Sequence, residues 1–166
     1  KQPAAPRARR AGRRYDWRME LYFIRHGETE IGDDHLYPDN ASLTPLGQRQ
    51  ADAACDALRD AGITQIFTSD LQRANESAAR AVEFTGLTPV ALPGLDEERI
   101  GDLREAAIVT IKRRLYNGAP VADFTECNGE STPEFEERII YCFARNVVEP
   151  LNDNSRPALF VHGGTI

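Results

Sequence analysis

The sequence predicts an α/β fold, a three-layer αβα sandwich with a mainly parallel central sheet. Short apolar runs of strand length alternate along the chain with stretches whose apolar residues recur at helical spacing. Parallel strands are joined by crossover helices, which cover both faces of the sheet. The chain has 166 residues, 41% of them hydrophobic and 28% charged, which suits one folded domain with a sizeable core.

Four apolar runs are the predicted strands. The first covers residues 21–24 and is expected to be short and buried. The second covers residues 63–68, and a weaker third covers residues 89–95. The fourth covers residues 158–161, close to the end of the sequence.

Two helices are predicted between the first three strands. The first begins with Thr44 as N-cap and Pro45 at the first helical position, and Gly62 is expected to end it. The second follows Ser69, which is three residues before Gln72 in a spacing that resembles a capping box.

Two further helices are predicted between the third and fourth strands, at residues 103–116 and 134–149. The later one is opened by residues 131–133, Ser-Thr-Pro, and stops before Pro150. The polar stretch 31–42 is expected to be a loop.

Charge is unevenly distributed along the chain. Residues 1–18 contain seven basic residues and one acidic residue, a net charge of +6, while the whole chain carries −6. The remaining residues therefore sum to −12, and an acidic body argues against a nucleic-acid-binding surface. No apolar run approaches the roughly 20 residues of a membrane helix, so no membrane partner is expected.

The basic leader sets the expected domain boundary. We expect residues 1–18 to be disordered or not native, since Met19 stands directly before the first predicted strand. Residues 19–166 then form the folded domain, which we expect to be truncated at its C-terminus. The three cysteines, Cys55, Cys127 and Cys142, form neither a disulfide framework nor a zinc-ligand spacing, which favours a cytoplasmic location.

Two of the three histidines directly follow predicted strands, and glycine follows each of them. His26 comes after the first strand and His162 after the fourth. Ligands of open α/β sheets bind at the carboxyl ends of the strands, so both imidazoles are expected in one crevice. Arg25 precedes His26, and Arg73 lies early in the second helix. Two histidines with two arginines at strand and helix ends predict a phosphoryl-binding site.

Taken one at a time, each of these residues also allows a structural interpretation without a ligand. A single histidine after a strand is more often a satisfied structural residue, and a single arginine is usually a surface charge. Zinc is the other use of paired histidines, but the third, His35, lies in the polar loop and no metal-ligand spacing is present. We therefore predict no metal and no cofactor.

Four segments between residue 20 and the end of the chain carry a family resemblance. They are residues 25–29 (Arg-His-Gly-Glu-Thr), 43–51 (Leu-Thr-Pro-Leu-Gly with Gln50-Ala51), 69–74 (Ser-Asp-Leu-Gln-Arg-Ala) and 161–165 (Val-His-Gly-Gly-Thr). In order and spacing they resemble the histidine phosphatase superfamily, the phosphoglycerate mutase-like family. The resemblance implies the phosphoglycerate mutase-like version of the sandwich predicted above.

The resemblance implies a two-step phosphoryl transfer. His26 is the implied nucleophile, which would form a phosphohistidine. Arg25, Arg73 and His162 would bind the phosphoryl oxygens with help from amides near Gly163, and His162 would also stabilise the transition state.

The family also uses a carboxylic acid that protonates the leaving group and then activates water. Residues 94–101 are similar to the family's segment, and the position four residues before Gly101 is Glu97. Glu98, the next residue, and Glu28, close to the nucleophile, remain alternatives.

The departures from the family pattern favour a phosphatase over a mutase. Residues 30–34 lack the asparagine of cofactor-dependent mutases, and residues 103–105 replace a Trp-Glu-Gly segment. The expected activity is hydrolysis of a small phosphorylated metabolite. A mutase-type transfer and a phosphate-binding module with impaired catalysis remain alternatives. The sequence leaves the oligomeric state undecided, with a homodimer as one possibility.

Overall fold

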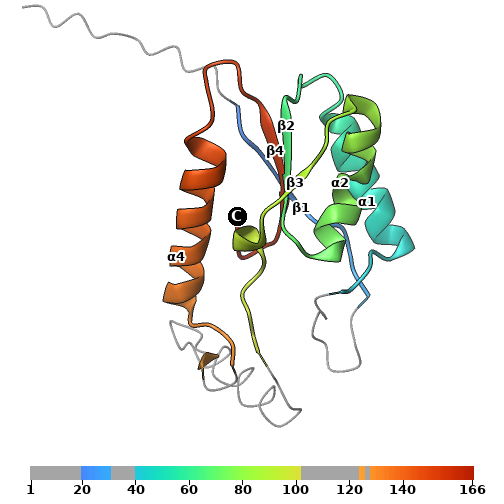
Figure 1. The fold of residues 1–166 in the computed structure, drawn as a ribbon. Coiled ribbons are helices and arrows are strands. Elements are labelled where there is room, and N and C mark those ends of the chain that lie inside the picture. Colours follow the sequence, from blue (N-terminus) through green and yellow to red (C-terminus); the bar gives the residue numbers. More distant parts are fainter. Residues whose placement is uncertain (1–19, 31–39, 102–123, 126–127) are drawn as a thin grey trace, which may run out of the picture.

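The computed structural model describes residues 20–30, 40–101, 124–125 and 128–166. In this part of the chain the predicted α/β fold is confirmed (Figure 1). A parallel four-stranded sheet has the order β1-β4-β2-β3, with helices on both faces. The predicted helix 103–116 and most of the predicted loop 31–42 lie outside the described residues.

The strands are β1 (Tyr22–Arg25), β2 (Gln65–Thr68), β3 (Val90–Ala91) and β4 (Pro157–Val161). The last strand in the sequence, β4, pairs with β1 on one side and with β2 on the other. The chain therefore returns at its end to the middle of the sheet. This return places segments near residues 26, 69 and 162 at neighbouring strand ends.

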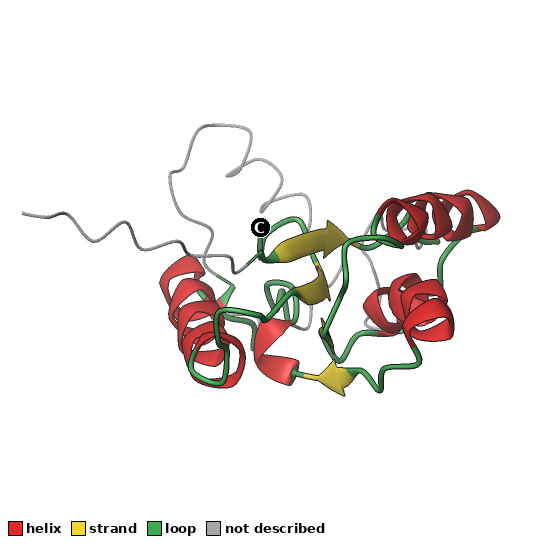
Figure 2. Cartoon of the chain, turned by 90° about the horizontal axis from the view of Figure 1, so that it is seen from above, coloured by secondary structure: helices red, strands yellow, loops and turns green. Residues whose placement is uncertain are grey.

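Helices cover the sheet in two layers (Figure 2). On one side, α1 (Pro45–Ala57) packs against α2 (Gln72–Thr85). On the other side lies α4 (Thr132–Cys142), which continues as a π-helical turn over Phe143–Val148. The sheet is the middle layer of the sandwich.

The central strand β4 shows why two cores form. All five of its residues are buried, and alternate side chains point to opposite faces. Ala158 and Phe160 join Cys55 and Ile66 in the core beneath α1 and α2. Leu159 and Val161 join the second core, on the α4 side.

Several sequence predictions of local structure hold. Thr44 caps α1, its hydroxyl accepting the Gly47 N–H at 3.0 Å, and Pro45 takes the first helical position. Ser131 caps α4, and its N–H donates to the Glu134 carboxylate at 2.8 Å. In the structure, Cys55 lies in the core beneath α1 and α2, and Cys142 lies in the core on the α4 side.

Other boundaries were predicted wrongly. The α-helical part of α1 ends at Ala57, before Gly62, which lies in the turn to β2 with a φ of 67°. The third strand is two residues long and is followed by a 3-10 turn over Pro93–Leu95. Proline lacks an N–H for a sheet ladder, so the strand ends before Pro93.

Two further expectations are corrected. Helix 134–149 begins earlier, at Thr132, and its α-helical part stops at Cys142. The first strand is short but lies at the sheet edge, with Phe23 41% exposed, so it is not a buried strand.

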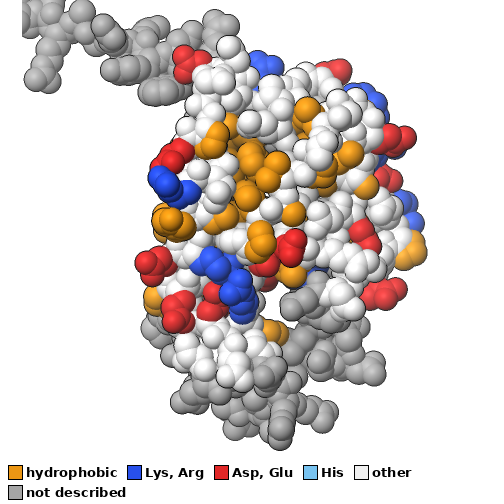
Figure 3. Space-filling model, in the orientation of Figure 1, with side chains coloured by type: hydrophobic (Ala, Val, Ile, Leu, Met, Phe, Trp, Pro, Cys, Tyr) orange, Lys and Arg blue, Asp and Glu red, His pale blue; other side chains and the backbone are white. Residues whose placement is uncertain are grey.

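An apolar groove of about 310 Å³ lies between β1 and α4, and Figure 3 shows hydrophobic side chains gathered there. Phe23, Phe143 and Leu159 line it, together with Ile140, which is 67% exposed. The α4 side of the sheet thus presents apolar surface. Among the described residues, no helix has the length and apolar character needed to cross a bilayer.

Candidate active site

Three adjacent strands end in a polar residue at the same edge of the sheet. His26 follows β1, His162 follows β4, and Ser69 follows β2. Backbone bonds extend the ladders past the strand ends: the His26 N–H donates to the Val161 carbonyl at 3.0 Å, and the Ser69 N–H donates to the Phe160 carbonyl at 3.1 Å. The two imidazole ring centroids lie 5.2 Å apart. The structure thus brings together the two histidines that were singled out in the sequence.

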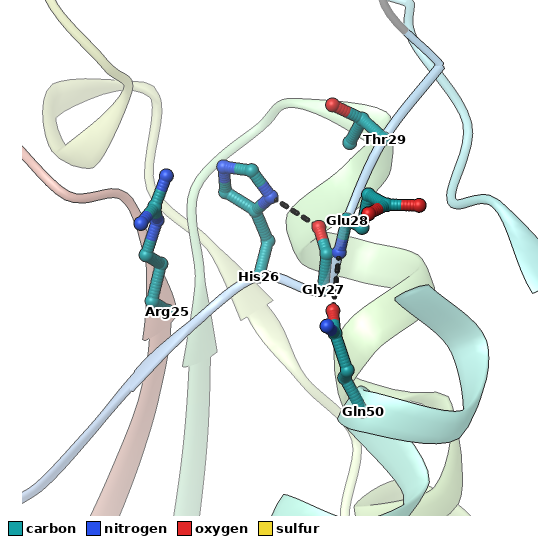
Figure 4. A pocket seen from close by; sticks show the side chains of 6 residues that line it. All are labelled: Arg25, His26, Gly27, Glu28, Thr29 and Gln50. Atoms are coloured by element: carbon teal, nitrogen blue, oxygen red, sulfur yellow. Dashed lines mark hydrogen bonds between the residues drawn. The ribbon is translucent and has the colours of Figure 1, made fainter. Parts of the chain in front are cut away.

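The tautomer of His26 follows from one hydrogen bond, drawn in Figure 4. Its Nδ1 lies 2.7 Å from the Gly27 carbonyl oxygen, which can only accept, so Nδ1 carries the hydrogen. In the neutral ring this leaves a lone pair on Nε2. Burial, with the nearby charges of Arg73 and Arg25, lowers the pKa of His26. The neutral form of the His26 ring is therefore favoured, with its lone pair on Nε2.

His162 is fully buried. Its Nε2 lies 2.7 Å from the Ser69 hydroxyl oxygen, and its Nδ1 has no hydrogen-bond partner among the described residues. Burial lowers the pKa of His162 to about 3, and the charge of Arg73 contributes. A second neutral ring therefore stands beside the first.

Both predicted arginines place a positive charge near the two imidazole rings. Arg73 is 3% exposed at the second position of α2, and its charge lowers the pKa of His26 and of His162. Arg25 is exposed and lies beside Gly163, where a Cβ would be in ordinary van der Waals contact with the Arg25 Nε at 3.6 Å. The arrangement of two cations and two neutral rings suits a dianion such as a phosphoryl group.

A pocket of about 360 Å³ opens beside His26 (Figure 4). Its floor and wall come from the turn after β1 and from α1. The Glu28 N–H donates to the Gln50 side-chain oxygen at 2.8 Å, which ties this turn to α1. The lining residues are Arg25, His26, Gly27, Glu28, Thr29 and Gln50.

The three candidate carboxylates have different surroundings. Glu97 accepts the Gly164 N–H at 3.3 Å, beside the loop that follows His162, and its charge acts on His26. Glu98 instead accepts from the Thr132 hydroxyl at 3.0 Å, at the start of α4. Glu28 lines the pocket and accepts from the Thr44 hydroxyl at 2.8 Å. Of the adjacent pair, Glu97 is the one that contacts the loop carrying His162.

Arg138 of α4 fixes the segment that carries Glu97. Its guanidinium donates to the carbonyls of Gly94, Asp96 and Glu97 at 3.0, 3.1 and 3.2 Å. It also forms a two-point ion pair with Glu130, which accepts the Arg99 N–H at 2.9 Å. These contacts give Arg138 a structural role, and they position the candidate acid.

We expect Arg138→Lys to lower stability by about 1–2 kcal/mol, because an ammonium cannot reproduce the forked donor geometry at a mostly buried site. The side chain of Arg138 is 15% exposed and that of Glu130 11%. Urea unfolding measures the change. Arg145→Lys is the matched control, since Arg145 and Glu149 form an ion pair that is more than half exposed. Equal midpoints for the two variants would contradict the positioning role.

The lowered pKa values of half-buried His26 and buried His162 predict that the protein loses stability as the pH falls below about 6.5. The unfolded chain takes up protons near the ordinary histidine pKa, whereas the folded chain resists protonation until lower pH, to about 3 for His162. Each such group changes the unfolding free energy by at most about 1.4 kcal/mol per pH unit. Unfolding curves across this range measure the slope. His162→Gln should flatten it, and an unchanged slope would contradict the assignment.

Ser69, Ser77 and Gln50 contact the site but were not predicted to do so. Ser69 was expected to form a capping box, which is wrong: α2 begins after Leu71, and the Ser69 hydroxyl accepts the Leu71 N–H at 3.2 Å. Ser77 accepts the Gly27 N–H at 3.1 Å. The signal for Ser69 was its place directly after β2, the same argument that identified the histidines.

The described residues contain no group of three or more His, Cys, Asp or Glu side chains able to hold a metal ion.

Comparison with known proteins identifies the family. Residues 21–166 match the model of the histidine phosphatase superfamily, branch 1. The chain belongs to the histidine phosphatase superfamily. A probable phosphoglycerate mutase GpmB of Klebsiella pneumoniae is 32% identical over 154 residues, which cover 87% of this chain and 70% of that protein.

Solved structures of the superfamily include phosphatases. A putative alpha-ribazole-5'-P phosphatase from Escherichia coli is 25% identical with a TM-score of 0.71, covering 89% of this chain and 75% of that one. A mycobacterial glucosyl-3-phosphoglycerate phosphatase is 28% identical with a TM-score of 0.70, covering 88% and 74%. The chain is thus similar to proteins named as phosphatases and as mutases.

Proposed function

We propose that this chain hydrolyses a phosphomonoester of a small metabolite through a phosphohistidine at Nε2 of His26. The observation that carries the proposal is the bond from His26 Nδ1–H to the Gly27 carbonyl. It puts the ring hydrogen on Nδ1, so that the lone pair of the neutral ring is on Nε2, and Arg73 and His162 lie near this ring.

The first step transfers the phosphoryl group to the protein. The Nε2 lone pair forms a bond to phosphorus as the ester P–O bond breaks, and Glu97 in its protonated form gives its proton to the leaving oxygen. Arg25, Arg73 and His162 hold the equatorial oxygens, where negative charge is balanced in the transition state.

The second step returns His26 to its starting state. Glu97, now a carboxylate, takes a proton from water, whose oxygen attacks the phosphohistidine. The P–N bond breaks, and inorganic phosphate leaves. Neither step uses a metal or cofactor. We propose that residues 19–166 form the one catalytic domain and that the enzyme acts in the cytoplasm. Its substrate is a metabolite rather than nucleic acid or a membrane.

Phosphate release over a panel of sugar phosphates, phosphoglycerates, nucleotides and phosphopeptides tests the proposal. The assay is run with and without chelator, with His26→Ala as background. Metal-independent release from at least one small ester supports it. Binding of esters without release or phosphohistidine formation would instead indicate a module with impaired catalysis.

The curated relatives named as probable phosphoglycerate mutases favour mutase-type transfer as the second candidate. The sequence departures at residues 30–34 and 103–105 support hydrolysis. A substrate with a labelled phosphoryl group separates the two activities: label in inorganic phosphate means hydrolysis, and label retained on an isomeric product means transfer.

Glu97→Gln should slow turnover of alkyl phosphates about 10²-fold or more, because an alkoxide leaves poorly without a proton donor. Aryl phosphates with acidic phenols should lose far less in the phosphorylation step. The measurement compares phosphohistidine formation with both ester types by rapid quench. Glu98→Gln is the matched control, since Glu98 contacts Thr132. Equal losses on both ester types would contradict the role of Glu97.

A further inference from the structure

Ser69 and His162 are held together at neighbouring strand ends, although 93 residues separate them in the sequence. Ser69 is fully buried, and its N–H donates to the Phe160 carbonyl of β4 at 3.1 Å. Its Oγ lies 2.7 Å from Nε2 of His162. The contact is short and buried, and it joins two side chains whose backbone follows paired strands of the sheet.

The direction of this hydrogen bond follows from the other partners of Ser69. Its Oγ accepts the Leu71 N–H at 3.2 Å, so one lone pair is used. The hydroxyl hydrogen needs an acceptor, and Nε2 of His162 is the acceptor given to it by the described residues. If Nε2 carried a hydrogen instead, a buried hydroxyl would be left without an acceptor, at a cost of about 1–3 kcal/mol.

We propose that Ser69 is a positioning residue that fixes His162 as the Nδ1–H tautomer, so that Nδ1–H is the donor offered to the substrate's phosphoryl oxygen. The phosphoryl role rests on the proposed function, whereas the tautomer does not. The Nδ1 atom is buried without a partner among the described residues, as expected of a donor reserved for a ligand. The other tautomer would direct a lone pair at an anionic oxygen.

The two imidazole rings thereby present opposite groups to a ligand: one presents a lone pair and the other an N–H. His26 gives its Nδ1–H to the Gly27 carbonyl and keeps a lone pair on Nε2 for phosphorus. His162 receives a hydrogen bond at Nε2 from Ser69 and keeps an N–H for oxygen. One ring is a nucleophile and its neighbour a donor because each contacts a different protein group.

Nitrogen NMR of the histidine-labelled wild-type protein tests the tautomer without any substrate. The chain has three histidines, so His26→Asn and His35→Asn variants assign the signals. We expect Nδ1 of His162 to carry the hydrogen and Nε2 to show the shift of an unprotonated nitrogen. A protonated Nε2 would overturn the proposal. Titration with inorganic phosphate should move the His162 Nδ1–H signal, and no movement would overturn its ligand role.

Ser69→Ala supplies the functional test. We expect kcat/KM to fall about 10- to 100-fold and the His162 signals to show a mixture of tautomers. Ser155→Ala is the matched control: Ser155 is 6% exposed and also accepts a backbone N–H, from Asn152 at 3.0 Å, away from the site. A folded Ser69→Ala variant with wild-type activity and tautomer would overturn the proposal. If that variant does not fold, the wild-type spectrum still decides.

If no phosphoester is turned over but phosphate still moves the His162 Nδ1–H signal, the proposed function fails and the role of Ser69 stands. If turnover is found with Nε2 protonated, the opposite holds. The two conclusions are therefore separable in one set of samples.

Discussion

His26→Ala is expected to lower phosphate release by about 10⁴-fold or more, because it removes the atom that forms the bond to phosphorus in the proposed mechanism. The remaining cations would still bind the ester, so KM should change far less than kcat. A rapid-quench experiment with labelled substrate should trap an acid-labile, alkali-stable phosphoprotein in the wild type and none in the variant.

The control for this result keeps the pocket and changes a charge away from it. Arg59→Ala removes an exposed arginine of the turn after α1, where it pairs with Asp56, and should leave both turnover and labelling unchanged. Labelling that persisted at wild-type level in His26→Ala would place the intermediate on another residue and end the assignment of His26.

The strand ends were the part of the site that the sequence could predict. Residues directly after the strands of a parallel sheet share one edge of that sheet, so His26 and His162 were expected to meet. Arg73 was placed near them by its position early in a helix. These inferences need only the order of elements and the rule that parallel strands end together.

The resemblance at residues 94–101 favoured Glu97 by its distance from Gly101, but the sequence left the adjacent Glu98 open. Adjacent side chains point in different directions, and the orientation of this segment is set by Arg138, about forty residues further along. Ser69 was misread for a similar reason. A Ser-x-x-Gln spacing suits a local cap, but a long-range bond to His162 competes for the same hydroxyl.

The predicted boundaries of elements were wrong where a single residue decides the boundary. Pro93 ends β3 because it cannot donate to the ladder, and the short turn it begins brings Gly94 against α4, where a Cβ would lie 2.5 Å from the Cys142 Sγ. The edge position of β1 depends on which strands pair with each other. The local pattern of apolar residues carries no information about that pairing.

Gly47→Ala is expected to destabilise the fold by about 3 kcal/mol or more, since overpacking against backbone cannot be relieved by a rotamer change. A Cβ at Gly47 would lie 1.9 Å from the Glu28 carbonyl oxygen, and one at Gly27 would lie 2.1 Å from the Gly47 oxygen. Gly47 is in α1, where alanine gains about 1 kcal/mol of helix propensity. The overlap outweighs that gain.

The same overlap should reach the chemistry. Alanine at position 47 pushes the turn after β1 away from α1, and this turn carries the Gly27 carbonyl that orients His26. The midpoint of urea unfolding and the rate of phosphate release should therefore both fall. Gly86→Ala is the matched control: Gly86 has open space around its Cβ position and a φ of 69°, so only the left-handed backbone cost of about 1–2 kcal/mol applies, far from the pocket. If Gly47→Ala were no less stable than Gly86→Ala, the close approach of α1 to the turn after β1 would not be what holds His26 in place.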